Sequence, residues 1–521
     1  MISLLILAPI LLPGVAAAIA MALPRHPRVQ RVLAFTVLLA SALAAGTLII
    51  RVDRGGIAAV QMGGWDAPIG ITLVADRLSA VMLFTSSIVL FAVMWYAISQ
   101  GVRDRRQSEP VAVFLPTYLL LTMGINLAFL AGDLFNLYVG FEIFLVASYV
   151  LLTVGATQPR VRAGVGYVMV SMASSLIFVI GLTLVYAAVG TMNMAQIGER
   201  MADISGGTET AIFAVLLIAF GIKAAVVPLD AWLPDSYPSA PALVTAVFAG
   251  LLTKVGVYSI IRMRTSVFTD GALDTLLMWV ALATMVIGIL GAVAQAEIKR
   301  LLSFTLVSHI GYMIFGISLG TAAGLSGAIF YAVHHILVQT TLFLVVGLIE
   351  RQTGTSSLRR LGSLLYSAPL IAVLYFLPAM NLGGIPPFSG FLGKLLLLQA
   401  GAQAGTWQAW VLVGGAVVTS LLTLYVMAFV FTKGFQRDRA DAPESSDESF
   451  PEGSPTPPPR GMVGATALLA AASLAMTPLA GPISAVTTRA AETAHDTDEY
   501  RTTILGLSLI HISEPTRLLS I

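Results

Sequence analysis

The chain has 521 residues, of which 57% are hydrophobic and only 11% are charged, with a formal net charge of +2 and no cysteine. A soluble protein carries about 25% charged residues, so this chain cannot cover its surface in water and is expected to lie in a lipid bilayer. The small net charge excludes nucleic acid as a partner, and the lack of cysteine excludes disulfides, thiolate-held zinc and iron–sulfur clusters.

Apolar runs long enough to cross a membrane, which takes about 20 residues, recur along almost the whole chain. We therefore predict an all-α polytopic membrane protein with fourteen transmembrane helices. The opening run lacks the basic start of a cleavable signal peptide, so we expect it to remain as the first helix. The predicted helices lie near residues 2–22, 31–50, 77–98, 111–131, 134–155, 164–189, 211–229, 241–262, 274–297, 301–320, 324–348, 365–400, 407–432 and 461–482.

Three segments lie outside the predicted bundle. Residues 433–460 include an acidic, Ser/Pro-rich stretch, which is typical of a disordered loop. Residues 483–505 form a polar tail, and residues 506–521 resemble the translated read-through of a sequencing adapter rather than native sequence.

Lysine and arginine are concentrated in the connections that follow odd-numbered helices, and the side richer in these residues normally faces the cytoplasm. Both termini and the even-numbered connections are therefore expected to face outward, and the loop at 433–460 to be cytoplasmic. The basic connections hold Arg25, Arg28, Arg31, Arg103, Arg105, Arg106, Arg160, Arg162, Lys299, Arg300, Arg351, Arg359, Arg360, Lys433, Arg437, Arg439 and Arg460.

Several ionisable residues lie in the middle of predicted helices, where a charge costs about 2.5–3.5 kcal/mol and is a functional candidate by default. A single lysine of this kind can instead extend to the membrane surface or hold two helices together in a static ion pair. A set spread over six helices favours ion conduction over these structural roles. The set comprises Glu142, Lys223, Lys254, His309, His334, His335 and Lys394.

Proton transfer is the chemistry that such a set permits. A buried lysine loses its proton more readily than an exposed one, and a nearby carboxylate favours the charged form. If Glu142 pairs with Lys223, separating the two would release the lysine proton to the next carrier, and histidine is a suitable intermediate because it titrates near neutral pH. A dehydrated Na⁺ site would need several oxygen ligands, yet Glu142 is the sole carboxylate placed near mid-membrane, so no metal site is predicted.

Other charged residues are expected to be structural. Asp76 and Asp133 each precede a predicted helix at the position of an N-cap. Glu297, Lys299 and Arg300 lie at a predicted cytoplasmic turn, where a solvated cluster is the simplest interpretation.

Two predicted helices carry helix-breaking residues next to a buried lysine. Pro228 follows Lys223 and begins a proline-rich stretch, and Pro386 and Pro387 precede Lys394 within GGIPPFSG. Proline removes a backbone donor, and interrupted helices beside buried charges in corresponding halves of a chain indicate a transporter site. Proline kinking without a functional role remains the alternative for either helix taken alone.

The motifs around these residues are specific, and the chain over residues 60–430 resembles one known family. That family is shared by Mrp-type Na⁺/H⁺ antiporters and the proton-pumping subunits of respiratory complex I and membrane-bound hydrogenases. Within this family, the length and the local sequence of the chain are similar to those of D-type Mrp subunits. The motifs are DLFNLYVGFEIF, IKAAVVPLDAWLPDSYPSAP, LLTKVGVYSI, IKRLLSFTLVSHIGYM and GGIPPFSGFLGK.

The resemblance implies a fold with three N-terminal helices in residues 1–110, followed by two inverted five-helix repeats. The repeats would be helices 4–8 (111–262) and helices 9–13 (274–432), with helices 7 and 12 discontinuous. Helix 14 (461–482) would follow.

The resemblance also implies residue roles. Glu142 would pair with Lys223, Lys254 would be the central carrier, His309 and His335 would link the two halves, and Lys394 would be the exit. His334 and Gln339 are secondary candidates; relatives often carry lysine at the position of Gln339, which leaves the order of carriers in the second half open.

The implied function is a proton-translocating subunit of a multisubunit Na⁺/H⁺ antiporter in the inner membrane of a prokaryotic cell. Its partners would be other membrane subunits, H⁺, Na⁺ and the lipid bilayer, and it would hold no cofactor and catalyse no covalent chemistry. The alternative is a proton-pumping subunit of NADH:quinone oxidoreductase or a membrane-bound hydrogenase. A third possibility is a scaffold that keeps the charges without transport.

Overall fold

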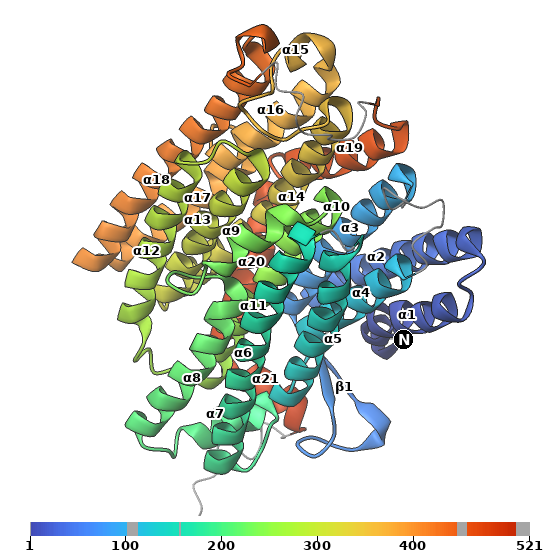
Figure 1. Ribbon diagram of the computed structural model, residues 1–521. Coiled ribbons are helices and arrows are strands. Elements are labelled where there is room, and N and C mark those ends of the chain that lie inside the picture. Colours follow the sequence, from blue (N-terminus) through green and yellow to red (C-terminus); the bar gives the residue numbers. More distant parts are fainter. Residues whose placement is uncertain (1, 102–112, 156–157, 445–455, 507–521) are drawn as a thin grey trace, which may run out of the picture.

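The computed structural model describes residues 2–101, 113–155, 158–444 and 456–506, and within them it is a bundle of long helices with one short β-hairpin (Figure 1). Part of the predicted disordered loop, 445–455, and almost all of the predicted non-native tail, 507–521, lie outside the described residues. The elements of the first half are α1 (Ile2–Ala22), α2 (Pro27–Gly55), β1 (Ala58–Gln61), β2 (Thr72–Ala75), α3 (Arg77–Gln100), α4 (Phe114–Leu130), α5 (Leu134–Thr153), α6 (Gln158–Val189), α7 (Met194–Met201), α8 (Gly206–Ala224), α9 (Trp232–Ser236), α10 (Ala242–Val247) and α11 (Thr253–Arg262).

The second half continues the bundle and adds two helices after the last predicted span. Its elements are α12 (Asp274–Val293), α13 (Ile298–Ser318), α14 (Ala322–Thr353), α15 (Leu364–Ser367), α16 (Pro369–Gly383), α17 (Ser389–Ala404), α18 (Trp407–Phe431), α19 (Arg460–Ala475), α20 (Ala480–His495) and α21 (Thr497–Leu505). Short 3-10 or π-helical segments are η1 (Met62–Gly64), η2 (Tyr237–Ser239), η3 (Phe248–Leu252), η4 (Met263–Val267), η5 (Thr432–Gln436) and η6 (Arg439–Asp441).

Eleven helices in the described residues are long and apolar enough to cross a membrane, or twelve if the bent pair α19–α20 forms one span. Two shorter apolar helices, α4 and α16, lie at predicted spans. The structure is therefore the polytopic helical membrane protein that the sequence predicts, whereas the count of fourteen and the inverted repeats stay predictions.

The C-terminal region differs from the prediction of one span at 461–482 followed by a polar tail at 483–505. α19 ends at Ala475 and α20 begins at Ala480, and the two helices are bent by 78°. Pro478 lies in the break, and a proline interrupts the helical hydrogen-bond ladder. α20 packs against α3 and α14, with its small residues buried on one face, so most of the predicted tail is folded. These residues are Thr487, Ala490, Ala491 and Ala494.

The first predicted break is present where α8 ends. Ala224 is the last residue of α8, Ala225 follows in the left-handed conformation with a φ of 59°, and the chain continues through Pro228 to α9. The backbone amide of Val227 donates to Thr284 Oγ1 on α12 at 3.1 Å, which supplies a partner for a backbone group outside a helix. This bond satisfies one backbone group of the break inside the bundle, where an interrupted membrane helix needs such partners.

The second predicted break lies between α16 and α17. α16 ends at Gly383, and Gly384 adopts a φ of 82°, which glycine tolerates because it has no side chain. Asn381 Oδ1 accepts hydrogen bonds from the backbone amide of Gly390 at 2.8 Å and from Ser389 Oγ at 3.2 Å. The amide side chain therefore joins the two half-helices across the break.

The centre of the molecule is formed by α10–α11, α13 and α14. All of the apolar window in 242–267, and 94% of the windows in α13 and α14, is buried inside the protein, whereas α1, α2, α6, α12 and α18 bury between 28% and 39%. The buried histidines and the buried lysines Lys254 and Lys299 lie on these central helices. Ionisable groups are thus placed where lipid does not reach.

One end of the bundle carries the β1–β2 hairpin, α7 and α21, and we call it the hairpin end; the opposite end carries α15 (Figure 1). β1 pairs with β2 in antiparallel register from Ala58 opposite Ala75 to Gln61 opposite Thr72. Asp76 and Asp133 begin α3 and α5 at the hairpin end, and both are N-caps as expected: their side chains accept from the backbone amides of Ser79 and Asn136.

Candidate functional site

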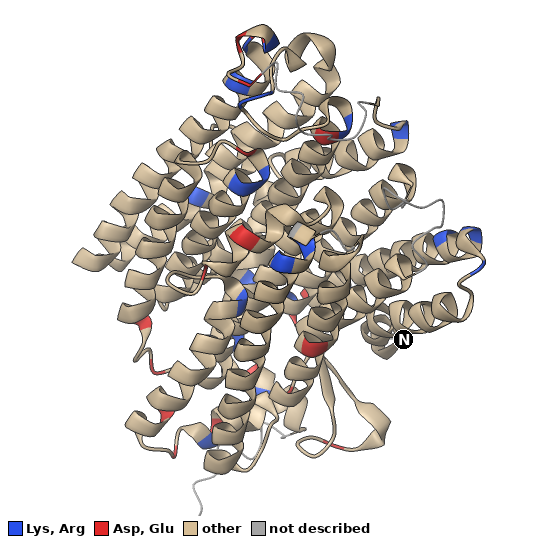
Figure 2. Cartoon of the chain, in the orientation of Figure 1, with Lys and Arg blue, Asp and Glu red and all other residues tan. Residues whose placement is uncertain are grey.

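Charged residues lie mainly near the ends of the helices, and a few blue segments lie half-way along them (Figure 2). Lys223, Lys254 and Lys394 are all buried, with exposed fractions of 7%, 0% and 5%. His309, His334 and His335 are fully buried. The predicted carriers other than Glu142 are therefore inside the protein, and their contacts define the candidate site.

Lys223 lies in the last turn of α8, just before the break. Its ammonium nitrogen donates to the backbone carbonyl of Ser171 at 3.0 Å and to Ser175 Oγ at 3.3 Å, both on α6. A cavity of about 10 Å³, close to the space that one water molecule needs, adjoins this lysine. Its lining residues include Tyr167, Ser171, Lys223, Trp232 and Tyr237.

Glu142 lies half-way along α5 and is half-buried. The described residues show no ion pair within 4.0 Å between Glu142 and Lys223, and the buried Oε1 atom of Glu142 has no hydrogen-bond partner among them. The lysine instead binds α6, because the carbonyl of Ser171 lies within its reach. The structure thus holds the two proposed partners apart.

Lys254 lies at the start of α11, in a helical stretch that changes from α-helical to π-helical and back. The π-helical segment η3 separates α10 from α11, and Lys254 Nζ donates to the carbonyl of Ala249 in that segment at 2.6 Å. A π-helical turn often occurs at a functional site. Gly256, two residues later, lies so close to α8 that an added Cβ would be 2.6 Å from the backbone nitrogen of Ala224. The helices that carry Lys254 and Lys223 are therefore in direct backbone contact.

The histidines form one aromatic cluster between α13 and α14. The ring centroids of His309 and His335 are 5.2 Å apart, and His309 Nδ1 lies 2.6 Å from the hydroxyl of Tyr331. His309 Nε2 lies 3.4 Å from Thr423 Oγ1 on α18. Neither ring nitrogen of His335 has a hydrogen-bond partner among the described residues.

His334 and Gln339 occupy different positions from His335 on α14. His334 Nδ1 lies 3.0 Å from Ser389 Oγ at the start of α17, so it contacts the second helix break. Gln339 Nε2 donates to the carbonyl of Leu302 on α13 at 2.7 Å. As neighbours on one helix, His334 and His335 point in directions about 100° apart, which gives them separate surroundings.

Lys394 lies on α17 and reaches back to the end of α16. Its Nζ donates to the carbonyls of Leu382 at 3.0 Å and Gly383 at 3.2 Å, and to Ser420 Oγ at 3.0 Å. Carbonyls in the last turn of a helix have no intrahelical donor, so the break itself supplies the acceptors. The same nitrogen lies 5.4 Å from the ring centroid of Tyr312.

Sequence reasoning missed two tyrosines, Tyr331 and Tyr312, that contact these residues. Tyr331 lies between His309 and His334, and Tyr312 donates to the carbonyl of Ala416 at 2.6 Å while contacting Lys394. Tyr331 lies four residues before His335, a spacing that places both on one face of a helix. That spacing is the signal that could have found it.

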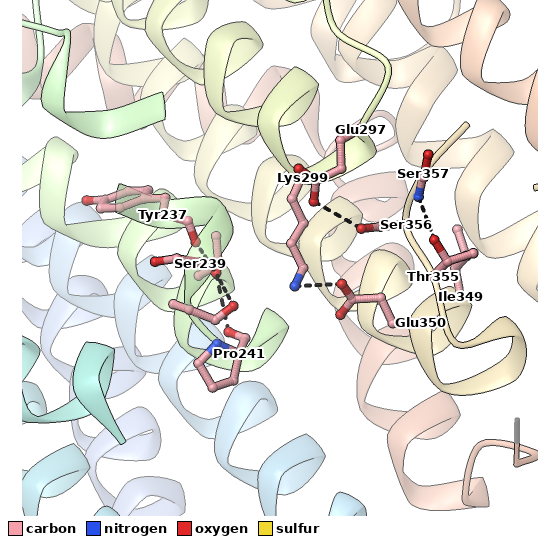
Figure 3. Close-up of polar contacts among 12 residues, drawn as sticks. Tyr237, Ser239, Pro241, Glu297, Lys299, Ile349, Glu350, Thr355, Ser356 and Ser357 are labelled. Atoms are coloured by element: carbon pink, nitrogen blue, oxygen red, sulfur yellow. Dashed lines mark hydrogen bonds and ion pairs between the residues drawn. The ribbon is translucent and has the colours of Figure 1, made fainter. Parts of the chain in front are cut away.

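The turn before α13 is partly buried, which corrects the expectation of a solvated cluster. Lys299 is 8% exposed and forms an ion pair with Glu350 at 2.6 Å, and Glu297 accepts from Ser356 Oγ at 3.1 Å (Figure 3). Burial raises the pKa of Glu297 above its ordinary range. Arg300 is exposed as expected and pairs with Asp235 at 2.9 Å. The cluster ties α13 to α14 and to α9.

Comparison with known proteins identifies the family. Residues 131–423, more than half of the chain, match the family described as NADH:quinone oxidoreductase/Mrp antiporter, transmembrane. The chain belongs to this NADH:quinone oxidoreductase/Mrp antiporter family. One relative is the D-type Na⁺/H⁺ antiporter subunit of Alkalihalophilus pseudofirmus, which is 36% identical over 446 residues that cover 85% of this chain and 89% of that protein.

Solved structures place the same fold in both branches of the NADH:quinone oxidoreductase/Mrp antiporter family. A chain of the Mrp complex from Dietzia sp. DQ12-45-1b matches with a TM-score of 0.88 and 32% identity, covering 97% of this chain and 99% of that one. A chain of respiratory complex I from Thermus thermophilus matches with a TM-score of 0.79 and 25% identity, covering 95% and 99%. The chain is therefore an antiporter-type subunit of a membrane assembly, similar to D-type Mrp subunits.

Proposed function

We propose that the chain is the proton-translocating subunit of a multisubunit Na⁺/H⁺ antiporter, and that it moves H⁺ inward while the assembled complex exports Na⁺. The observation that carries this proposal is a set of ionisable groups half-way along the helices, near two interrupted helices, which we call the row. Its members are buried, except for the half-buried Glu142. They are Glu142, Lys223, Lys254, His309, His335 and Lys394.

The contacts of the lysines suit proton transfer. Lys223, Lys254 and Lys394 donate to backbone carbonyls, and two of them also donate to serine hydroxyls. When the lysine loses its proton, these neutral acceptors carry no charge that is left unpaired. A carboxylate partner would instead be left as an unpaired buried charge, which is costly. Each lysine can therefore alternate between charged and neutral forms, with water completing the connections that side chains do not span.

Glu142 would act as the switch at one end of the row. An approach of its carboxylate to Lys223 favours the ammonium form, and withdrawal favours release of the proton toward Lys254. His309, His335 and the hydroxyl of Tyr331 would carry the proton on to Lys394 beside the second break. His334 and Gln339 would serve as secondary contacts in this half.

The proposed orientation places the hairpin end outside and the α15 end in the cytoplasm of a prokaryotic cell, with both termini outside. Basic side chains support this assignment, because lysine and arginine are frequent around α15 and η5 (Figure 2). Arg359, Arg360, Lys433, Arg437 and Arg439 lie there. The side of a membrane protein that is richer in lysine and arginine normally faces the cytoplasm.

The second candidate is a redox-driven proton pump of the complex I type, which the likeness to the Thermus thermophilus chain favours. Sodium dependence separates the two candidates.

The test uses everted membrane vesicles that contain the chain expressed with its partner subunits. The vesicles are energised by respiration and carry a fluorescent pH-gradient probe. Addition of NaCl is expected to collapse the gradient, and choline chloride is expected to leave it unchanged. A complete complex with no sodium response would overturn the antiporter proposal, and co-purifying flavin and iron–sulfur absorbance would support the redox-driven pump.

A further inference from the structure

Asn381 is a fully buried residue in the last turn of α16, and its side chain caps α17 from across the second break. Gly390 is the second residue of α17, so its backbone amide is among the first amides of a helix that have no partner within it. Phe388, at the N-cap position, makes no side-chain hydrogen bond to the helix. Asn381 Oδ1 accepts from the amide of Gly390 at 2.8 Å instead. The side chain of one half-helix thus supplies the cap that the other lacks.

Lys394 makes the reciprocal contact. It belongs to α17, and its ammonium donates to the carbonyls of Leu382 and Gly383, the last two residues of α16, at 3.0 Å and 3.2 Å. Carbonyls at the end of a helix have no donor within that helix. An added Cβ at Gly384 would lie 3.1 Å from Lys394 Nζ, so the lysine lies directly against the backbone of the break. Each half-helix therefore satisfies a backbone group of the other.

The two contacts respond differently to the loss of a proton. A hydrogen bond from a charged donor is stronger than one from a neutral donor, so Lys394 holds the two carbonyls less firmly when it becomes a neutral amine. The amide of Asn381 does not titrate, so its bond to Gly390 persists in both states of the lysine. Leu382 and Gly383 follow Asn381 directly in the chain. The bond of Asn381 therefore keeps their carbonyls in place while the lysine is without its proton.

Ser389 ties the same break to the central helix α14. Its hydroxyl donates to Asn381 Oδ1 at 3.2 Å, and His334 Nδ1 lies 3.0 Å from the same hydroxyl oxygen. A serine hydroxyl has one hydrogen, so with that hydrogen directed to Asn381, His334 Nδ1 is the donor to Ser389. All three side chains are fully buried. They form one hydrogen-bonded chain from α14 through α17 to α16.

We propose that Asn381 is a positioning residue for Lys394. By capping α17 from α16, it keeps the last carbonyls of α16 beside the lysine nitrogen while this nitrogen gains and loses its proton. Ser389 and His334 support the same position, because they fix the break to α14. This inference rests on the proposed function and adds a residue to its exit.

Electron cryo-microscopy of the assembled complex tests the position without relying on transport. Asn381→Leu keeps the size of the side chain and removes its oxygen, so we expect Lys394 Nζ to leave the carbonyls of α16. The matched control is Asn126→Leu on α4, because Asn126 is also fully buried and donates to the carbonyl of Pro9 on a neighbouring helix at 2.7 Å. Lys394 should keep its contacts in this control. Unchanged contacts of Lys394 in Asn381→Leu would overturn the proposal.

Transport separates positioning from a merely structural role. In everted vesicles with equal amounts of assembled complex, Asn381→Leu should slow sodium-dependent proton transport by about 100-fold, because a displacement of about 1 Å at a reacting centre can cost that much. The ratio of the rates in water and heavy water should rise, because exchange of the Lys394 proton becomes the slow step. A loss of active complex would lower both rates equally and leave the ratio unchanged. Asn126→Leu should keep the wild-type rate and ratio.

A wild-type rate in Asn381→Leu would overturn the proposal, and so would a slow rate with the wild-type ratio. Should Asn381→Leu not assemble, Ser389→Ala gives the decisive result. It removes the hydroxyl bond to Asn381 and leaves the bond from Gly390, so the rate should fall by about tenfold, the effect of about one hydrogen bond, and the ratio should rise. An unchanged rate and ratio in Ser389→Ala would contradict the role of the break.

The proposed function can fail separately from this inference. A wild-type complex without sodium response would contradict the antiporter proposal. The position of Lys394 in Asn381→Leu and in Asn126→Leu would still be decided by microscopy, because that comparison needs no transport.

Discussion

The three buried lysines share one property at the scale of single residues: their hydrogen-bond acceptors are neutral. Lys223 and Lys254 bind carbonyls of α6 and of η3, and Lys394 binds carbonyls at the end of α16. A static ion pair would hold a lysine in its charged form, whereas a neutral acceptor accommodates both forms. The contacts therefore favour carriers over helix-joining ion pairs.

Replacement of Lys394 by arginine separates charge from proton exchange. Arginine keeps a positive charge and several donors but does not lose its proton in proteins. We expect Lys394→Arg to assemble and to lose sodium-dependent proton transport in vesicles. Lys433→Arg, a matched change in η5 outside the row, should keep the wild-type rate. Transport by Lys394→Arg at the wild-type rate would show that deprotonation of this side chain is not required.

Burial raises the pKa of Asp133 above its ordinary value, and this shift predicts how stability depends on pH. Because the folded-state pKa, about 6, lies above the ordinary value of 3.8, the ionised carboxylate destabilises the fold at high pH, and this cost disappears as the pH falls through that interval. Asp133→Asn should therefore be more stable than wild type by about 3 kcal/mol at about pH 8. The advantage should shrink toward about pH 4. Thermal unfolding of the complex across this pH range measures the stability advantage of Asp133→Asn. An advantage that does not change with pH would contradict the raised pKa of Asp133.

At the scale of helices, hydropathy predicted most spans because a membrane helix needs a long apolar run. The predicted ranges 77–98 and 134–155 correspond to α3 and α5 within a few residues. The hairpin β1–β2 was not predicted, since strands of four residues leave little periodic signal. α20 and α21 were missed because they are amphipathic and packed on the bundle, and hydropathy alone does not separate such helices from a polar tail.

The candidate site was predictable in its residues but not in its contacts. Charge in an apolar run identified Lys223, Lys254 and Lys394, and proline and glycine identified the two breaks. The acceptors could not be predicted, because a carbonyl becomes available only where a helix ends or widens, as Gly383 and Ala249 show. The same limit applies to the contacts of Tyr331 with His309 and Tyr312, because these two residues come from a second helix, α13.

The close contact between α8 and α11 yields a prediction at this scale. A methyl group at Gly256 would lie 2.6 Å from the backbone nitrogen of Ala224, so Gly256→Ala must push the helices of Lys254 and Lys223 apart. Overpacking of this kind costs about 1–3 kcal/mol, and we expect slower transport per assembled complex. Gly166→Ala on α6, where nothing lies within 4 Å, is the matched control. Equal rates in the two variants would show that the spacing of α8 and α11 does not limit transport.

At the scale of the whole molecule, the outer helices expose apolar side chains, as expected for surfaces that contact lipid or other membrane subunits. α6 exposes Val165, Met169, Met172 and Leu176, and Glu142 on the adjacent α5 is only half-buried. A half-buried carboxylate at mid-membrane is costly against lipid. A neighbouring subunit is therefore expected to cover this side, in keeping with the membrane assemblies in which similar chains occur.

This expectation predicts that the chain does not work alone. In liposomes the purified chain should show no sodium-dependent proton transport, and the complete complex should show it under the same conditions. The amount of folded chain in both preparations is the control. Robust antiport by the single chain would contradict the need for partner subunits and leave Glu142 without the cover proposed for it.

The proton path through Lys223 is the central claim, and one comparison tests it most directly. Everted vesicles with equal amounts of assembled complex are energised by respiration and given NaCl, for wild type, Lys223→Ala and Lys433→Ala. We predict that sodium collapses the pH gradient in wild type and in Lys433→Ala but not in Lys223→Ala. Collapse at the wild-type rate in Lys223→Ala would contradict the account.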